Sequence, residues 1–445
     1  MCGIVGYLGP RDASPVLLEG LRRLEYRGYD SAGISILTEE GVLKTVKRPG
    51  KISVLEEALD GNRPVGHCGI AHTRWATHGG PTEVNAHPHF SADGDIALVH
   101  NGIIENADEL RADLQELGYE FRSETDTEVM IHLIDEAFKG NQALENAVAA
   151  ALLQVEGAYG IAVVSTRDPG KLVAARNGSP LLLGIGKDGE YLVGSDAAAL
   201  VTHTRNVIYL DDGDVAVMNG EGHWTFHLER GAVSRPIQRV TWDLGAIEKE
   251  GFEHFMLKEI FEQPSSLRDV LRGRLLPEEG AAKLGGITIS DLELLRIKRI
   301  IITACGTSWH SALLGEYMLE ELARVPVEVE YASEFRYKSP LVDETTLVIA
   351  ISQSGETADT LAALREGKRR GAPTMGIVNA VGSTIARETD FGVYLHAGPE
   401  IGVASTKAFT SQVVALALFS LYLARRRGLS LEAGHRIVRA LSALP

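Results

Sequence analysis

The most constraining feature of this 445-residue chain is the regular alternation of β-like and helical patterns in its second half. After Glu253, compact strand-like runs are each separated by a helical stretch. These runs occupy residues 299–303, 327–331, 347–352, 374–379 and 391–395. The pattern predicts βαβ units and therefore a doubly wound parallel sheet. The last helices are predicted at residues 407–427 and 431–444.

The first half has a different rhythm, in which short strand-like runs are bounded by Gly, Asp and Asn turns. Strands are predicted at residues 4–8, 33–37, 69–75, 96–99, 160–164, 191–194 and 215–218, and helices at 15–24, 107–117, 127–138 and 144–153. This clustering predicts sheets covered by helices rather than an all-β barrel. We therefore expect a first domain over residues 1–235, a linker over 236–253 and a second domain over 254–445.

Composition excludes several classes of function. The formal net charge of −16 argues against a nucleic-acid partner, because nucleic-acid binding needs a basic surface. Three scattered cysteines do not form a disulfide framework and indicate a reducing compartment. No secretory leader pattern is present, and the longest apolar run, residues 413–424, is too short to span a bilayer. We expect a cytoplasmic protein without a membrane partner.

The N-terminus places a thiol directly after the initiator methionine. Methionine aminopeptidases remove Met1 when the next side chain is small, and Cys2 meets this condition. Cys2 would then carry a nucleophile and a free α-amino group, whose reference pKa of about 7.7–8.0 suits a base near neutrality. A nucleophile activated by its own terminal amine is a known route to acyl transfer. The alternative is that Cys2 only starts a buried strand.

Four polar clusters accompany this thiol, at residues 74–80, 85–89, 100–102 and 123–127. Amide hydrolysis needs donors for the oxyanion, which the Asn101 side chain and the Gly102 N–H are suited to supply. An amino-acid substrate also presents a carboxylate, which fits the Arg74 fork, and an ammonium, which fits Asp126. The structural alternatives are an ion-paired or surface Arg74, a hairpin turn at Asn101-Gly102, and a helix cap at Ser123 or Asp126.

The spacing of the candidate residues supports neither a metal site nor a nucleotide-binding motif. The candidate metal ligands are His67, Cys68, His72, His78, His87, His89 and His100. They have neither CxxC spacing nor a helical i,i+4 pair. The dinucleotide-like spelling at residues 184–189 precedes a strand-like run, so it is interpreted as a hairpin turn. We expect no metal and no cofactor.

Three loops rich in hydroxyl groups precede helices in the second half, at residues 304–308, 352–357 and 402–407. Backbone N–H groups at a helix N-terminus bind anions, and Ser and Thr hydroxyls add donors. Ligands bind at the carboxyl edge of the sheet in this architecture, so the loops predict an anion site. Helix capping is the alternative for any single loop. Cys305 is interpreted as a small packing residue.

Five motifs of the first half closely resemble the glutaminase domain of the glutamine–fructose-6-phosphate aminotransferase family. They occupy residues 1–6, 23–31, 74–78, 100–102 and 123–128. The resemblance implies an N-terminal-nucleophile αββα sandwich that releases ammonia from L-glutamine. It implies that Cys2 attacks the side-chain amide while its own amine moves the proton. The implied roles are an oxyanion hole for Asn101 and Gly102, glutamine binding for Arg74, Thr77, His78 and Asp126, and an ammonia-channel gate for Trp75.

The loops of the second half resemble the first sugar-isomerase (SIS) domain of the same family, which binds fructose 6-phosphate. The implied phosphate ligands are Thr307, Ser352, Gln353, Ser354 and Thr357, and the implied sugar contacts are Ser308, Val403 and Ser405. The implied reaction converts fructose 6-phosphate and glutamine to glucosamine 6-phosphate and glutamate. The resemblance also implies a homodimer.

The chain departs from this family in its length, because it stops at Pro445, where a linker to a second sugar-isomerase domain should begin. That domain carries the isomerase catalysts, so we expect these residues to hydrolyse glutamine but to make little or no amino sugar. One alternative is a sugar-phosphate-sensing regulator fused to a degenerate glutaminase. Another pairs the glutaminase with a phosphoribosyl acceptor. It is disfavoured because the loops do not resemble an acidic pyrophosphate-sugar motif.

Overall fold

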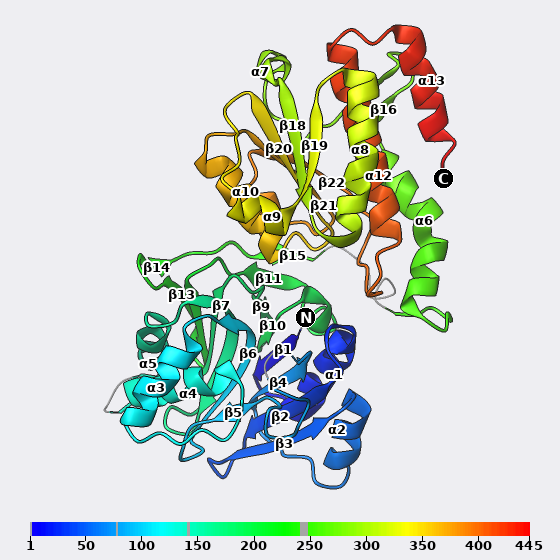
Figure 1. The fold of residues 1–445 in the computed structure, drawn as a ribbon. Helices are drawn as coiled ribbons and strands as arrows, with labels where there is room; N and C mark the ends of the chain where they lie inside the picture. Colours follow the sequence, from blue (N-terminus) through cyan, green and yellow to red (C-terminus); the bar gives the residue numbers. More distant parts are fainter. Residues whose placement is uncertain (1, 77–78, 140–142, 241–247) are drawn as a thin grey trace. The chain divides into compact units, whose positions relative to one another are not determined.

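The computed structural model describes residues 2–76, 79–139, 143–240 and 248–445 (Figure 1). The chain divides into two compact units, Met1–Leu244 (unit 1) and Gly245–Pro445 (unit 2). This division falls inside the predicted linker, residues 236–253. The linker is not featureless, because it contains the short strand β15 (Gln238–Arg239), which pairs with a strand of unit 1.

Two antiparallel sheets form the centre of unit 1. In the described residues, the first sheet has the order β15-β11-β9-β10-β1-β4-β2-β3, and the second has the order β14-β13-β12-β8-β7-β6-β5. The strands of the first sheet are β1 (Gly3–Leu8), β2 (Ser31–Leu37), β3 (Leu43–Pro49), β4 (Cys68–Arg74), β9 (Leu182–Ile185), β10 (Tyr191–Gly194), β11 (Asn206–Tyr209) and β15. Those of the second are β5 (His89–Phe90), β6 (Ile96–Ile104), β7 (Gly157–Ser165), β8 (Leu172–Asn177), β12 (Asp214–Asn219), β13 (Gly222–His227) and β14 (Gly231–Val233).

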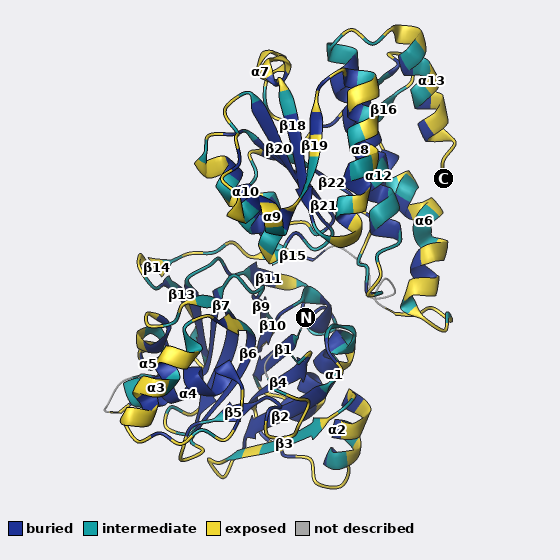
Figure 2. Ribbon diagram, viewed as in Figure 1, coloured by how far each residue is buried: buried dark blue, intermediate teal, exposed yellow. Residues whose placement is uncertain are grey.

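Strand β6 shows how the sequence builds the layers of unit 1. Side chains alternate across a strand, so Ala97 and Val99 pack in the core between the two sheets. Ile96 and Leu98 point the other way and pack in the core that also contains residues of the helices. Helices α1 (Ala13–Leu24) and α2 (Ile52–Leu59) pack against the first sheet, and α3 (Ala107–Glu116), α4 (Asp126–Ala137) and α5 (Leu144–Leu152) are associated with the second. The αββα sandwich is therefore confirmed, and Figure 2 shows its central strands as mostly buried.

Two short motifs of unit 1 have opposite outcomes. The hairpin interpretation of residues 184–189 is confirmed, because β9, which ends at Ile185, pairs antiparallel with β10, which begins at Tyr191. The hairpin alternative for Asn101-Gly102 is wrong, because both residues lie inside β6 and pair with β7. Antiparallel pairing with β7 continues past this dipeptide to Ile104, and no turn is formed at that point.

Unit 2 contains a parallel sheet in the order β19-β18-β20-β21-β22. Its elements are α6 (Phe255–Leu271), β16 (Leu275–Leu276), β17 (Ala281–Ala282), α7 (Asp291–Arg296), β18 (Arg299–Ala304), α8 (Gly306–Ala323), β19 (Val327–Tyr331), α9 (Ala332–Tyr337), β20 (Thr346–Ser352), α10 (Ala358–Arg369), β21 (Thr374–Val378), α11 (Thr384–Glu388), β22 (Phe391–Tyr394), α12 (Lys407–Arg426) and α13 (Leu431–Ser442). Ile300 and Ile302 of β18 pack in the same core as residues of α8 and α12. Ile301 packs on the opposite face with residues of α9 and α10. The predicted doubly wound sheet is therefore confirmed.

Helix α12 is long and apolar enough to meet the length and composition test for a membrane span. However, 78% of its most apolar window is buried inside the structure. Its side chains belong to the main core of unit 2, where α12 packs against α8 and α6. The helix predicted at residues 407–427 is therefore a core helix, and an apolar core helix has the same composition as a membrane span.

Candidate active site

Cys2 lies at the start of the central strand β1, where the backbone of β4 leaves the first sheet. β1 pairs with β4 from Gly3 opposite Thr73 onward, which sets the thiol beside the end of β4. The Trp75 N–H donates to Cys2 Sγ at 3.3 Å, and the thiol lies 3.5 Å from the Trp75 carbonyl oxygen. Cys2 directly precedes the buried strand β1. Its position at the start of this strand is therefore compatible with a catalytic role of its thiol.

Asn101 reaches this thiol residue from the second sheet. Its Nδ2 donates to the carbonyl oxygen of Cys2 at 3.1 Å, and its Oδ1 lies 2.9 Å from His72 Nε2. Gly102 follows with a φ of +137°, and an added Cβ would lie 1.9 Å from the Ala158 carbonyl oxygen. A side chain at position 102 is therefore excluded by both the backbone conformation and the contact with β7.

Arg74 and Asp126 bring opposite charges to the same region. Arg74 is 3% exposed and donates to the carbonyl oxygens of Gly80 and Gly79 at 3.2 and 3.4 Å. Burial lowers the pKa of its guanidinium, while charge interactions with Cys2 and Asp126 act in the opposite direction. Asp126 is the first residue of α4, and its Oδ2 accepts a hydrogen bond from the Ile104 N–H at 2.9 Å. The side chain of Asp126 therefore contacts β6.

The segment that carries Arg74 is held by Asp30, which the sequence analysis did not single out. The Asp30 N–H donates to the Arg74 carbonyl oxygen at 3.0 Å, and Asp30 Oδ2 accepts from the Ala76 N–H at 2.8 Å. Trp75 lies between these contacts, is 41% exposed and has its ring edge-on to Tyr29. The only sequence signal for Asp30 was its place in the motif at residues 23–31. Predicted residues Thr77 and His78 lie outside the described residues.

The environment of Cys2 keeps its thiol protonated. Burial raises its pKa above the ordinary value of a cysteine. The hydrogen bond with the Trp75 backbone and the charge of Arg74 act against this effect but do not reverse it. A thiolate is the reactive nucleophile. Reaction at this site therefore needs a base that takes the proton from Sγ as the thiol attacks.

In unit 2, the first two predicted loops follow strands β18 and β20, which are neighbours in the parallel sheet. The sheet order reverses at this pair, because the chain continues from β18 to β19 on one side and from β20 to β21 on the other. Such a switch point leaves a crevice at the carboxyl ends of the strands. Among the described residues, the N-cap side chains Cys305 of α8 and Thr357 of α10 make no capping hydrogen bond. The capping alternative is therefore not supported for these two loops.

The loop after β20 is tied by its own hydroxyl groups. Ser352 Oγ accepts from the Gly355 N–H at 2.9 Å and lies 3.0 Å from Thr357 Oγ1. Ser354 Oγ accepts from the Glu356 N–H at 3.2 Å. These bonds fold residues 352–357 into a tight turn in front of α10. Thr307, in the loop after β18, is exposed at the start of α8.

Helix α12, which follows the third loop, packs on α8, which follows the first. Gln412 Nε2 of α12 donates to Ser308 Oγ of α8 at 2.9 Å. Ser308 is buried in this contact, whereas Val403 is 81% exposed. The start of α12 is already capped, because Glu400 accepts from the Thr406 and Ala408 N–H groups at 2.8 and 3.1 Å. Glu400 Oε2 also accepts from Ser405 Oγ at 2.8 Å. An anion at the start of α12 would therefore compete with the Glu400 carboxylate.

Comparisons with known proteins cover both units. A family profile described as "Glutamine amidotransferase domain" matches residues 72–202, and one described as "SIS domain" matches residues 293–422. The chain is 55% identical over 450 residues to the glutamine–fructose-6-phosphate aminotransferase (isomerizing) of Chlorobaculum tepidum, covering 100% of this chain and 73% of that protein. The protein of the same name from Thermus thermophilus is 53% identical, with 100% and 72% coverage. This chain belongs to the glutamine–fructose-6-phosphate aminotransferase family.

Solved structures include a C-terminal domain of glucosamine-fructose-6-phosphate aminotransferase from Francisella tularensis. It is 40% identical over 44% of this chain and 55% of that chain, with a TM-score of 0.42.

A cluster of buried imidazoles adjoins the oxyanion candidate Asn101 in this aminotransferase. Burial lowers the pKa of both His72 and His89 to about 3, so these rings are neutral. His87 Nε2 and His100 Nδ1 both contact Thr127 Oγ1, at 2.9 and 3.0 Å. In the part of the chain that the structure describes, no group of three or more His, Cys, Asp or Glu is arranged to hold a metal. His87 and His100 therefore share one hydroxyl group as a hydrogen-bonding partner.

His72 is a residue that the sequence analysis named only as a possible metal ligand. The available signal was its spacing of two residues from Arg74 within β4, because residues i and i+2 of a strand share a face. The hydrogen bond with Asn101 could not be predicted, since it joins strands of different sheets.

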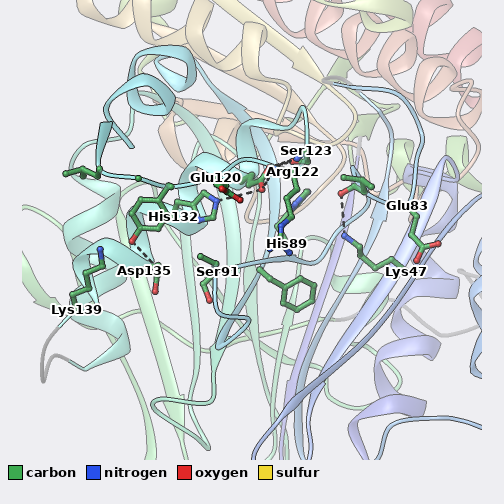
Figure 3. A pocket seen from close by; sticks show the side chains of 17 residues that line it. Lys47, Glu83, His89, Ser91, Glu120, Arg122, Ser123, His132, Asp135 and Lys139 are labelled. Atoms are coloured by element: carbon green, nitrogen blue, oxygen red, sulfur yellow. Dashed lines mark hydrogen bonds and ion pairs between the residues drawn. The ribbon is translucent and has the colours of Figure 1, made fainter. Parts of the chain in front are cut away.

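A cavity of about 830 Å³ lies in unit 1 and is lined in part by His89, Ser123 and His132 (Figure 3). Lys47 also lines it, and burial lowers the pKa of this lysine to about 8. The cavity borders the imidazole cluster through His89, whose Nε2 lies 3.1 Å from Thr125 Oγ1. Cys2, Arg74 and Asn101 do not line it. The hollow is therefore separate from the groups that surround the thiol.

Proposed function

We propose that this chain is a glutamine-dependent aminotransferase, in which unit 1 releases ammonia from L-glutamine and unit 2 binds fructose 6-phosphate. The complete reaction yields glucosamine 6-phosphate and L-glutamate, and the steps proposed for these residues are the hydrolysis of glutamine and the binding of the sugar phosphate. The observation that carries the proposal is the pairing of Cys2 with the Asn101 carboxamide in an αββα sandwich. The relatives with this printed name are about half identical to the whole chain, which supports the same reaction.

The first half-reaction transfers the glutamine acyl group to sulfur. Cys2 Sγ attacks the side-chain amide carbon, and the amide oxygen gains the negative charge of a tetrahedral intermediate. Asn101 Nδ2 and the Gly102 N–H stabilise this oxygen. The nitrogen takes up a proton, the C–N bond breaks and ammonia departs. A thioester between Cys2 and the glutamyl group remains. Water then hydrolyses the thioester, which yields glutamate and restores the thiol.

The base for this step is the α-amino group of Cys2 after removal of Met1. Burial holds the thiol in its protonated form, so a neighbouring base is required. In the described residues, the hydrogen bonds of Sγ are to the backbone of Trp75, which does not titrate. A terminal amine has an ordinary pKa of about 7.7–8.0 and therefore accepts a proton near neutrality.

The remaining residues of unit 1 hold the substrate. Arg74 binds the α-carboxylate as a fork, and Asp126 binds the α-ammonium, because each supplies the opposite charge. Thr77 and His78 complete the glutamine site, and Trp75 gates the path of ammonia.

The sugar phosphate binds at the switch point of unit 2. Thr307, Ser352, Gln353, Ser354 and Thr357 bind the phosphate, with help from the first N–H groups of α8 and α10. Ser308, Val403 and Ser405 contact the sugar. We also propose a homodimer in the cytoplasm, with residues 1–235 and 254–445 as its two domains.

The test is the intact mass of the purified chain with and without a glutamine analogue that carries an electrophile in place of the side-chain amide. We expect a mass lacking Met1 and one adduct, located at Cys2 by peptide mapping. Glutamate release should disappear in Cys2→Ala. Full activity in a chain that retains Met1 would disprove the role of the amine. Unchanged activity in Cys2→Ala would favour a regulator that senses sugar phosphates.

A further inference from the structure

The carboxamide of Asn101 is held at both ends. Its Nδ2 donates to the Cys2 carbonyl oxygen at 3.1 Å, and its Oδ1 lies 2.9 Å from His72 Nε2. The two ends of a carboxamide have nearly the same shape, but one donates hydrogen bonds and the other only accepts them. The partners of the group therefore decide which end faces Cys2.

The contacts of His72 fix its role as a donor. Its Nε2 also lies 3.1 Å from the His100 carbonyl oxygen, which only accepts hydrogen bonds. Nε2 must carry a proton to satisfy that oxygen, and the same N–H then requires an acceptor from Asn101. A rotated carboxamide would turn its own N–H groups toward the N–H of His72 and its oxygen toward the oxygen of Cys2. Both contacts would be repulsive.

The ring of His72 is itself fixed by its surroundings. It is 1% exposed and lies in β4, opposite Ile4 of β1 and Gly33 of β2. It stacks on His87 with ring centroids 4.2 Å apart. His87 is held in turn by Thr127. The direction of the Nε2–H is therefore set by packing from three sides before any substrate binds.

We propose that His72 is a positioning residue of the oxyanion hole, which turns the Asn101 nitrogen toward the reacting carbonyl of glutamine. This inference rests on the proposed glutamine hydrolysis. A carboxamide nitrogen carries two protons. One holds the Cys2 carbonyl oxygen, and the other is directed to the oxygen that becomes negative when Sγ attacks. His72 does not touch the substrate and acts only through Asn101.

A pair of amide substitutions separates this role from simple packing. In His72→Gln the side-chain nitrogen is as many bonds from the backbone as Nε2, whereas in His72→Asn it is as many bonds away as Nδ1. We expect kcat for glutamine hydrolysis to fall about 100-fold in His72→Asn with KM within about threefold, as for the loss of an oxyanion donor. We expect His72→Gln to remain within about tenfold of the unchanged enzyme.

Alkylation of Cys2 by iodoacetamide provides the control, because this displacement forms no oxyanion. Its rate should be unchanged in both variants, whereas a collapsed site would slow alkylation and hydrolysis together. The variant with both His72→Asn and Asn101→Ala should be about as slow as Asn101→Ala alone, since residues that act as a unit are not additive.

Equal kcat values for His72→Asn and the unchanged enzyme would overturn the inference. Additive losses in the double variant, or parallel loss of alkylation, would also overturn it. Absence of glutamine hydrolysis in the unchanged enzyme would instead contradict the proposed function, so the two failures are distinguishable.

Discussion

The dipeptide Asn101-Gly102 combines a chemical requirement with a steric one. Asn101 supplies a carboxamide that contacts Cys2, and Gly102 allows β6 to continue against β7 with a φ of +137°. A Cβ at position 102 would meet the Ala158 carbonyl oxygen at 1.9 Å. Gly118 also has a positive φ, of +92°, but nothing lies within 4 Å of the position of its Cβ. Substitution of Gly118 therefore tests backbone strain alone, whereas substitution of Gly102 tests backbone strain together with steric overlap.

We predict that Gly102→Ala lowers the free energy of unfolding by about 2–4 kcal/mol, since strain and overpacking add. Gly118→Ala should lower it by only about 1 kcal/mol, because only the strained backbone conformation contributes. Urea denaturation of both variants measures the difference. Equal losses in the two variants would mean that the contact with Ala158 relaxes at no cost.

The residues predicted from sequence are those whose chemistry is visible in their own side chains. Cys2, Asn101 and Arg74 were singled out because each carries a group that amide hydrolysis needs. Asp30 and His72 were not, because they act on other residues of the protein through hydrogen bonds. These hydrogen bonds depend on which strands become neighbours in the fold. The spacing of residues along the sequence does not show which strands these are.

The strands that were predicted carry a clear apolar pattern, and those that were missed carry charged residues or alanine. The described parallel strands of unit 2 were all predicted, because the central strands β18, β20 and β21 are mostly apolar runs and the edge strands β19 and β22 have an alternating pattern. β3 was missed, since it pairs only with β2 and carries Lys44, Lys47 and Arg48 among its residues. β8 was missed because two of its six residues are alanine, which has low strand propensity.

The turn before α4 depends on one buried carboxylate. Glu128 accepts hydrogen bonds from the Arg122 N–H at 2.8 Å and from the Ser123 N–H and hydroxyl at 2.6 Å each. Burial raises the pKa of Glu128, but the nearby His132 ring and the hydrogen bonds from Ser123 and the Arg122 backbone outweigh it and lower the pKa to about 2. The turn leads into α4, which begins at Asp126, so this carboxylate supports the proposed glutamine site.

We predict that this contact stabilises the fold above the unfolded pKa of about 4.3 and is lost as the pH falls toward 2. The sign follows because the folded state holds the proton more weakly than the unfolded state. The stability difference between the unchanged protein and Glu128→Gln should shrink by about 1 kcal/mol between about pH 6 and pH 3.5. The same denaturation series on Glu116→Gln, at an exposed site on α3, should show a constant difference.

The loops at the switch point of unit 2 give a prediction about binding. We expect Thr307→Ala to weaken fructose 6-phosphate binding about 10- to 100-fold, because a hydrogen bond to a charged group contributes about 1.5–3 kcal/mol. Thr345→Ala is the matched control, since Thr345 directly precedes β20 and thus lies at the opposite edge of the sheet. Calorimetric titration measures both. Equal affinities of the two variants would show that the phosphate does not bind at the start of α8.

Each unit has its own hydrophobic core. The cores of unit 1 lie between and outside its two sheets, and those of unit 2 lie on both faces of its parallel sheet. The contacts described here for Cys2 come from unit 1, and those for Ser308 and Ser352 come from unit 2. We therefore expect that a substitution can abolish the reaction of the thiol without abolishing the binding of the sugar phosphate.

We predict that Cys2→Ala abolishes glutamate release but keeps the affinity for fructose 6-phosphate within about threefold, because the contacts described for the two sites lie within different units. Cys68→Ala is the control for loss of a thiol. Cys68 is 3% exposed, and burial raises its pKa to about 12, which makes it a poor nucleophile. Glutamate release should survive in Cys68→Ala, and the glutamine affinity label should still form one adduct. Loss of sugar-phosphate binding in Cys2→Ala alone would show that the thiol contributes to the structure of unit 2 as well as to catalysis in unit 1.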